Sequence, residues 1–328
     1  MKGKILLKNI SMGRFSKAIA VVKDQTSIHL AKRATISDLD VAIVKATCHD
    51  EYPSEECYIQ EILNLTSESP LYVASCVNTI SRRLNKTRNW AVALKILMLV
   101  QKLLYEGNPK YQEEIFFATR RGTRLLNMSD FRDALRSNTW DYAAFVRTYA
   151  LFLDEQLEYK MQGKRRKHSS FALEKDEEDD TEPVAIVVPV NEMTNEQIFA
   201  RNNHLMQLLE RFIACRPTGG ARRHRMVMVA LYPTLIQSFQ LYHDITEIMG
   251  VLLKRFDGLN VSYSMKVYGN FQRVAKQFDE LDLFYDWCKS VGVARTSEYP
   301  EVEKISQNKL NAMDEHIKGK SDESKQET

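Results

Sequence analysis

The chain has 328 residues, of which 44% are hydrophobic, and its 46 basic and 43 acidic side chains leave a formal net charge of +3 at pH 7. That length and hydrophobic content are enough for a substantial core. No run of about 18 apolar residues occurs, so no membrane-spanning helix is expected. The apolar patch at residues 5–7 is short and is interrupted by Lys8, which excludes a secretory signal.

Basic side chains dominate residues 1–33, although the whole chain is nearly neutral. This region has eight lysines and arginines against a single acid, Asp24. Such an excess suits an anionic partner, either a phospholipid surface or a nucleic acid. Residues 1–12 combine lysines with Ile5, Leu6 and Ile10. We therefore expect them to be disordered in solution and to become helical on anionic vesicles.

Helical periodicity covers most of the first half of the chain. An apolar stripe ends at Lys45, and Ser54 is expected to cap the helix that follows. The run 89–104 is apolar nearly all round, which predicts a central buried helix that ends at Gly107. The other expected helices span residues 54–66, 70–84, 110–120, 122–127, 129–136 and 140–161.

A charged segment separates this half from a second helical half. In residues 162–192 a basic block, GKRRKHSS, is followed by an acidic one, EKDEEDDTEP, and this predicts disorder. Helices resume at Thr194, and Pro233 is expected to bend or divide a long helix because it has no amide hydrogen. The last two expected helices span residues 260–290 and 302–317.

These patterns predict an all-α fold, an irregular right-handed α-solenoid of about ten helices. Four divisions of the chain are expected. They are an N-terminal helical stack with a membrane-facing basic end, a charged disordered linker, a C-terminal helical half that continues the stack, and a disordered tail. Their residues are 1–161, 162–192, 193–318 and 319–328.

The sequence contains no motif for catalysis. The phosphate-binding, dinucleotide, zinc-protease and serine-hydrolase signatures are all absent. The five cysteines have no metal-binding spacing, and their use is typical of a reducing compartment. Cys48 and His49 are adjacent, and adjacent helical side chains point about 100° apart, so they make a poor nucleophile and base. We expect a protein that is not an enzyme and needs no cofactor or metal.

Lys45 and His49 form the most suggestive pair of side chains. They lie about one helical turn apart at the corner before Pro53, where both could face a multiply charged phosphate. The alternative is a solvated helix end with an ordinary histidine. Taken alone, the two residues favour that alternative.

Longer stretches of the sequence favour the phosphate site over the solvated helix end. Residues 45–59, KATCHDEYPSEECYI, are similar to the phosphoinositide-binding segment of ANTH domains, the N-terminal modules of clathrin-assembly proteins. The resemblance spans about residues 15 to 305 and is strongest to the plant branch of the family. It implies an ENTH-like N-terminal half extended by a further helical bundle. The stretches that carry it are 81–108, 116–133, 138–155 and 284–302.

The family's phosphoinositide motif is Lys, nine residues, Lys, any residue, Lys or Arg, then His or Tyr. Lys45 and Tyr58 match its first and last positions, whereas Glu55 and Cys57 occupy the two basic positions between them. The resemblance therefore implies headgroup binding that is weaker and less specific than the full motif would give. The residues it implies, together with nearby basic residues, are Lys23, Lys32, Arg33, Lys45, His49 and Tyr58.

The resemblance also implies a function and a set of partners. The protein would be a non-enzymatic adaptor in clathrin-mediated vesicle formation. It would bind phosphoinositide membranes (phosphatidylinositol 4,5-bisphosphate foremost), the clathrin coat and an R-SNARE, with no nucleic acid expected. It would be a cytoplasmic, peripheral membrane protein of coated pits and vesicles, at the plasma membrane or the Golgi. A helical-repeat scaffold or a nucleic-acid-binding protein that uses the same basic surface stays open as the alternative.

Overall fold

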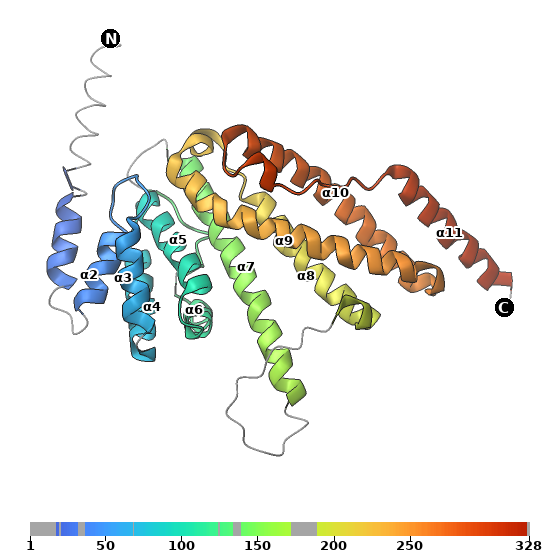
Figure 1. Ribbon diagram of the computed structural model, residues 1–328, viewed down its shortest axis with the longest axis horizontal. Coiled ribbons are helices and arrows are strands. Elements are labelled where there is room, and N and C mark those ends of the chain that lie inside the picture. Colours follow the sequence, from blue (N-terminus) through green and yellow to red (C-terminus); the bar gives the residue numbers. More distant parts are fainter. Residues whose placement is uncertain are drawn as a thin grey trace, which may run out of the picture. The chain divides into compact units, whose positions relative to one another are not determined.

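The computed structural model describes residues 18–19, 21–31, 37–67, 69–123, 125–133, 139–171 and 189–326 (Figure 1). These ranges are largely helical and contain no strand, which confirms the all-α expectation. None of the helices in them combines the length and apolarity needed to cross a bilayer. The chain divides into two compact units. Unit 1 holds Met1–His168 and Pro217–Ala230, and unit 2 holds Ser169–Arg216 and Leu231–Thr328.

Unit 1 is built around helix α5. Thirteen of its 17 residues are buried, and it contacts α3, α4 and α6, which confirms the predicted central helix. Besides the helical segment 21–31, the unit contains α2 (Ser37–Ala46), α3 (Glu56–Ser67), α4 (Pro70–Lys86), α5 (Trp90–Glu106), α6 (Lys110–Arg120) and most of α7 (Trp140–Phe171).

Side-chain caps define the ends of α4 and α5. The Ser69 hydroxyl accepts the Leu71 amide at the start of α4, where Pro70 needs no amide partner. The Asn89 side chain accepts the Val92 amide at the start of α5, at 3.0 Å. Only three residues therefore separate the two helices, so the basic end of α4 lies next to the first turn of α5.

Two expected helices, 122–127 and 129–136, are wrong in the part of them that the structure describes. Residues 121–123 and 125–133 form turns and bends instead. Gly122 and Leu126 adopt left-handed backbone conformations, with φ of 83° and 63°, which a right-handed helix does not accommodate. The Asn127 side chain donates to the Thr119 and Thr123 carbonyls and so satisfies groups exposed at the end of α6.

Unit 2 is a helical bundle with an aromatic core. Phe212 stacks on Phe284 with ring centroids 5.0 Å apart, and the Tyr285 hydroxyl hydrogen-bonds the buried Ser238 hydroxyl at 2.9 Å. Pro233 lies inside α9, which is therefore one helix and not two. The helices are α8 (Asn195–Ala214), α9 (Arg225–Arg255, from Leu231 onward in this unit), α10 (Val261–Val291) and α11 (Gln307–Gln326).

Several boundaries differ from those expected. Helix α7 continues to Phe171, so the start of the expected linker is helical, and residues 172–188 lie outside the described residues. Helix α11 begins at Gln307, not at 302, and continues to Gln326 through most of the expected disordered tail. The expected membrane-binding residues 1–12 also lie outside the described residues.

The segment 217–224 belongs to unit 1, not to the C-terminal half that the sequence suggested. The Asp141 carboxylate accepts the Gly220 amide at 3.0 Å and the Thr218 hydroxyl at 3.1 Å. The Tyr142 hydroxyl donates to the Gly220 carbonyl at 3.2 Å. These contacts attach the segment to the first turn of α7, a pairing of residues nearly 80 positions apart that no local pattern predicts.

The glycine in this attachment generates a stability prediction. Gly219 has a φ of +45°, and an added Cβ would lie 2.0 Å from an Asp141 carboxylate oxygen. Gly219→Ala should therefore lower the free energy of unfolding by about 1–3 kcal/mol. Gly163→Ala is the matched control, because a Cβ there meets no atom within 4 Å. It should raise helix stability by about 0.5–1 kcal/mol. Urea unfolding of both variants measures the difference, and equal stabilities would contradict the prediction.

Candidate functional site

A basic pocket is the candidate site of unit 1. It is open, has a volume of about 710 Å³, and is lined by the helical segment 21–31, α2, the second half of α4 and the start of α5. Five lysines and arginines and one histidine line it, and Asp40 is the acid among the lining residues. The basic lining residues are Lys23, His49, Arg82, Arg83, Lys86 and Arg88.

The outer cations of the pocket are free to bind a ligand. Lys23, Lys86 and Arg88 are exposed and form no hydrogen bond or ion pair with the described part of the chain. Arg82 is partly neutralised, because its guanidinium lies 3.9 Å from the Asp40 carboxylate. The rim of the pocket therefore carries uncompensated positive charge.

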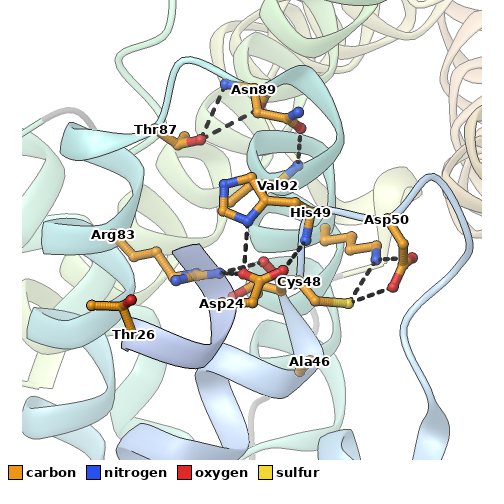
Figure 2. Close-up of polar contacts among 12 residues, drawn as sticks. Asp24, Thr26, Ala46, Cys48, His49, Asp50, Arg83, Thr87, Asn89 and Val92 are labelled. Carbon is orange, nitrogen blue, oxygen red and sulfur yellow. Dashed lines mark hydrogen bonds and ion pairs between the residues drawn. The ribbon is translucent and has the colours of Figure 1, made fainter. Parts of the chain in front are cut away.

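The inner cations are already paired (Figure 2). The Asp24 carboxylate lies 2.7 Å from His49 Nδ1 and accepts the His49 amide at 2.9 Å and the Arg83 guanidinium at 3.4 Å. Arg83 also donates to the Thr47 carbonyl at 2.7 Å. Burial alone would raise the pKa of Asp24, but the hydrogen bonds from His49 and the charges of His49 and Arg83 outweigh it and hold this pKa below 3.8.

A second cluster holds the turn that carries His49. Lys95 is fully buried in α5, and its ammonium lies 2.7 Å from the Asp50 carboxylate and 3.3 Å from the Cys48 sulfur (Figure 2). The Cys48 thiol donates to Asp50 at 2.7 Å. Burial, with the hydrogen bond to Asp50, raises the pKa of this thiol. The cluster fixes residues 48–50 and thereby the position of His49.

The structure separates the residues that the sequence grouped. His49 and Lys23 line the pocket, whereas Lys45 and Tyr58 do not and instead pair with each other. The Lys45 ammonium lies 4.9 Å from the centre of the Tyr58 ring. Lys32 and Arg33 lie outside the described residues.

Two further details of this corner differ from expectation. The expected cap residue Ser54 donates its hydroxyl to the Ala46 carbonyl at 2.5 Å, so it closes the end of α2 and does not start α3. Glu55 and Cys57, at the two non-matching motif positions, are exposed. Neither of them lines the pocket.

The basic residues at the end of α4 and in the turn after it were not among the predicted site residues. Arg82, Arg83, Lys86 and Arg88 place four cations within seven positions, just before a residue that caps the next helix. That density at a helix C-terminus was a usable signal, since the helix dipole favours cations there.

The described residues contain no group of His, Cys, Asp or Glu suited to a metal ion. The arrangement suits the binding of a multiply charged anion.

The lowered pKa of Asp24 generates a prediction about acid stability. A carboxylate whose pKa is lower in the folded than in the unfolded chain stabilises the fold above its unfolded pKa and stops doing so as the pH falls through the folded value. Asp24→Asn should lower the free energy of unfolding by about 1–2 kcal/mol at pH 7. That gap should close below about pH 4. Urea unfolding of both proteins from pH 7 down through the acid range below about pH 4 is the measurement, and a gap that persists unchanged through that acid range would contradict the assignment.

Comparison with known proteins identifies the relatives of this chain. The ANTH domain family model matches residues 38–319. A putative clathrin assembly protein of Arabidopsis thaliana is 60% identical over 322 residues, which cover 94% of this chain and 54% of the relative. The clathrin coat assembly protein AP180 of the same plant is 39% identical over 327 residues, which cover 94% of this chain and 50% of the relative. The chain thus spans about half the length of these relatives.

Among solved structures, the ENTH domain of epsin-2, in complex with phosphatidylinositol 4,5-bisphosphate, has a similar fold. The TM-score is 0.55 at 15% identity, over 82% of this chain and 97% of that domain. At this identity the similarity concerns the fold alone. The family match, in contrast, covers most of the chain and includes α4 and the start of α5, which line the pocket, but not the helical segment 21–31. The chain belongs to the ANTH domain family.

Proposed function

We propose that this chain is the membrane-binding module of a clathrin-assembly protein and that its basic pocket receives the phosphorylated headgroup of a phosphoinositide. The observation that carries the proposal is the set of three cations, Lys23, Lys86 and Arg88, that have no partner among the described residues and lie around a pocket of about 710 Å³. The names of its relatives support a role in clathrin assembly. The ligand of the epsin-2 ENTH domain belongs to the chemical class that such a pocket suits.

The chemistry of the pocket matches a phosphomonoester. This group carries nearly two negative charges and three acceptor oxygens, and charge-assisted hydrogen bonds to it are about twice as strong as neutral ones. Arginine can bind it through two parallel hydrogen bonds, as Arg88 could at the rim. Each basic side chain near an anionic leaflet adds about 1 kcal/mol of attraction, and salt screens that attraction.

The proposed role is that of an adaptor, not of a catalyst. The protein would lie on the cytoplasmic face of coated pits and vesicles, held there by the pocket, and would join the lipid surface to the clathrin coat. Lys45 and Tyr58, although outside the pocket, remain candidates for a secondary contact with the same surface. The nucleic-acid alternative would use the same cations, so the test includes it.

Vesicle sedimentation tests the pocket directly. Vesicles containing phosphatidylinositol 4,5-bisphosphate should bind the chain more tightly than vesicles matched in charge with phosphatidylserine. Lys86→Glu with Arg88→Glu should weaken binding at least about tenfold at about 0.15 M salt, because two attractions become repulsions. Lys110→Glu with Arg121→Glu, an exposed pair at the two ends of α6 that does not line the pocket, is the matched control and should bind like the parent.

Two results would contradict the assignment. If both double variants bound the vesicles equally, the pocket would not be the site. If the parent bound single-stranded RNA and neither vesicle type, the nucleic-acid alternative would replace the proposal.

We also propose that unit 2 binds an R-SNARE helix on the face of α10 that α11 covers. The contact is small, since α11 buries three side chains, Leu310, Met313 and Ile317, and is otherwise mostly polar. Lys320 adds hydrogen bonds to the Asp257 and Leu259 carbonyls, at 2.7 and 2.9 Å. A helix held by so few apolar contacts is displaceable by a partner helix with a complete apolar stripe.

Removal of residues 307–328 tests this second surface and leaves the Tyr242 contacts with residues 301 and 303 in place. The truncated chain should bind an R-SNARE peptide at least about tenfold more tightly, since the partner no longer competes with α11. Titration calorimetry measures the affinity, and circular dichroism checks that unit 2 stays folded. If unit 2 melts, α11 is ordinary core. An unchanged affinity would remove the support for a binding face.

A further inference from the structure

Asp24 pairs with two basic lining residues of the pocket, His49 and Arg83, as an anionic ligand would. It is the acid of the helical segment 21–31, and three donors surround its carboxylate: the His49 ring, the His49 amide and the Arg83 guanidinium. The side chains of His49 and Arg83 are only 14% and 13% exposed, and both line the pocket. The chain therefore supplies its own anion to the two deepest basic groups of the site (Figure 2).

These donors are not fully used by Asp24. The Arg83 Nε atom is buried and has no hydrogen-bond partner. A carboxylate offers two oxygens and one charge, whereas a phosphomonoester offers three oxygens and nearly two charges. A phosphate at this position would offer these donors more acceptor oxygens and more charge than Asp24 does, and water would hydrate the released carboxylate.

The segment that carries Asp24 is held to unit 1 by little else. Among its described residues Ala31 alone is buried, and Val21, Val22 and Leu30 are 60%, 63% and 64% exposed. Within the part of the chain that the structure describes, Asp24 makes the segment's only hydrogen bonds and ion pairs to the rest of unit 1. The contacts of Asp24 therefore do two things at once: they hold segment 21–31 to unit 1, and they occupy the donors of His49 and Arg83.

We propose that a headgroup phosphate displaces Asp24 from His49 and Arg83, and that this exchange releases segment 21–31 onto the bilayer. The inference rests on the proposed function, because the ligand is the phosphoinositide headgroup of the pocket. Val22, Lys23 and Leu30 share one helical face that lines the pocket, so a bound headgroup brings this face to the lipid surface. Exposed aliphatic side chains beside a lysine suit the interface of an anionic bilayer.

The first test measures the competition in the full chain. Asp24→Asn keeps the shape and an acceptor oxygen but removes the charge. It should bind soluble inositol 1,4,5-trisphosphate at least about tenfold more tightly than the parent in titration calorimetry, because no internal anion has to be displaced. Glu61→Gln makes the same charge change on the exposed face of α3, away from the pocket, and should not alter the affinity.

An unchanged or lower affinity of Asp24→Asn would overturn the proposal, because Asp24 would then not compete with the ligand. The same result combined with a loss of binding in Lys86→Glu/Arg88→Glu would leave the proposed function intact. If neither Asp24→Asn nor Lys86→Glu/Arg88→Glu altered binding, both the displacement of Asp24 and the proposed function of the pocket would be contradicted.

The second test follows the segment itself. On addition of the trisphosphate, hydrogen exchange of the amides in 21–31 should become faster in the parent, since the attachment is lost. In Asp24→Asn, exchange should be fast with or without ligand. Slower exchange in the parent would mean that the ligand clamps the segment, which contradicts release.

The bilayer step has its own readout. Val21→Ser changes an aliphatic side chain of the segment that is 60% exposed and does not line the pocket. It should weaken binding to vesicles containing phosphatidylinositol 4,5-bisphosphate about twofold or more, because less apolar surface enters the interface. Binding of the soluble trisphosphate should stay unchanged, which shows that the pocket is intact. Equal vesicle binding by this variant and the parent would overturn insertion of the segment.

Discussion

The ion pair between Lys95 and Asp50 is the interaction on which the site depends. Helix α5 runs through the core of unit 1, and Lys95 lies in it with no exposed surface. A buried ammonium without a partner costs several kcal/mol, so the fold must bring an acceptor to it. Asp50 and the Cys48 sulfur meet that requirement and fix the turn between α2 and α3. His49 lies in that turn, and its position sets the inner wall of the pocket.

The basic residues of the pocket fall into an inner and an outer layer, which differ in whether an acidic side chain pairs with them. The inner layer, His49 and Arg83, is satisfied by Asp24 from a helix that is otherwise loosely packed. In the outer layer, Lys86 and Arg88 are open to solvent and have no ion-pair partner within the described ranges. In the proposed function, attraction of an anion and completion of its binding would therefore be separate steps, governed by different residues. In the proposed exchange, this separation would let a headgroup alter the chain as well as bind to it.

The two units contribute different kinds of surface to the proposed adaptor. Unit 1 offers a charged concave site suited to a small, highly charged ligand. Unit 2 has an aromatic core that is sealed in part by α11, whose three buried side chains make a modest contact. Screening by salt weakens binding at a charged site but does not weaken an apolar contact, so ionic strength should separate the two proposed activities.

Local patterns were sufficient for most helices of this protein. The apolar run of α5, the helix end at Lys45 and the helical repeats of α4 and α6 follow from spacing of side chains over a few turns, which is information that a sequence carries directly. The same reasoning gave helices at 122–127 and 129–136 that are wrong in their described parts, where Gly122 and Leu126 adopt left-handed conformations.

The site, in contrast, was decided by tertiary structure. The sequence indicated a phosphate-binding corner at Lys45 and His49, and its likeness to ANTH domains indicated the ligand class. It could not show that His49 faces Asp24 and Arg83, which are separated from it by 25 and 34 positions, while Lys45 turns to Tyr58. Such pairings depend on how whole helices pack, because packing brings together charged residues that are far apart in the sequence. The sequence by itself thus determined most helices and the family and indicated the ligand class that we propose, and packing alone selected the cations that form the pocket.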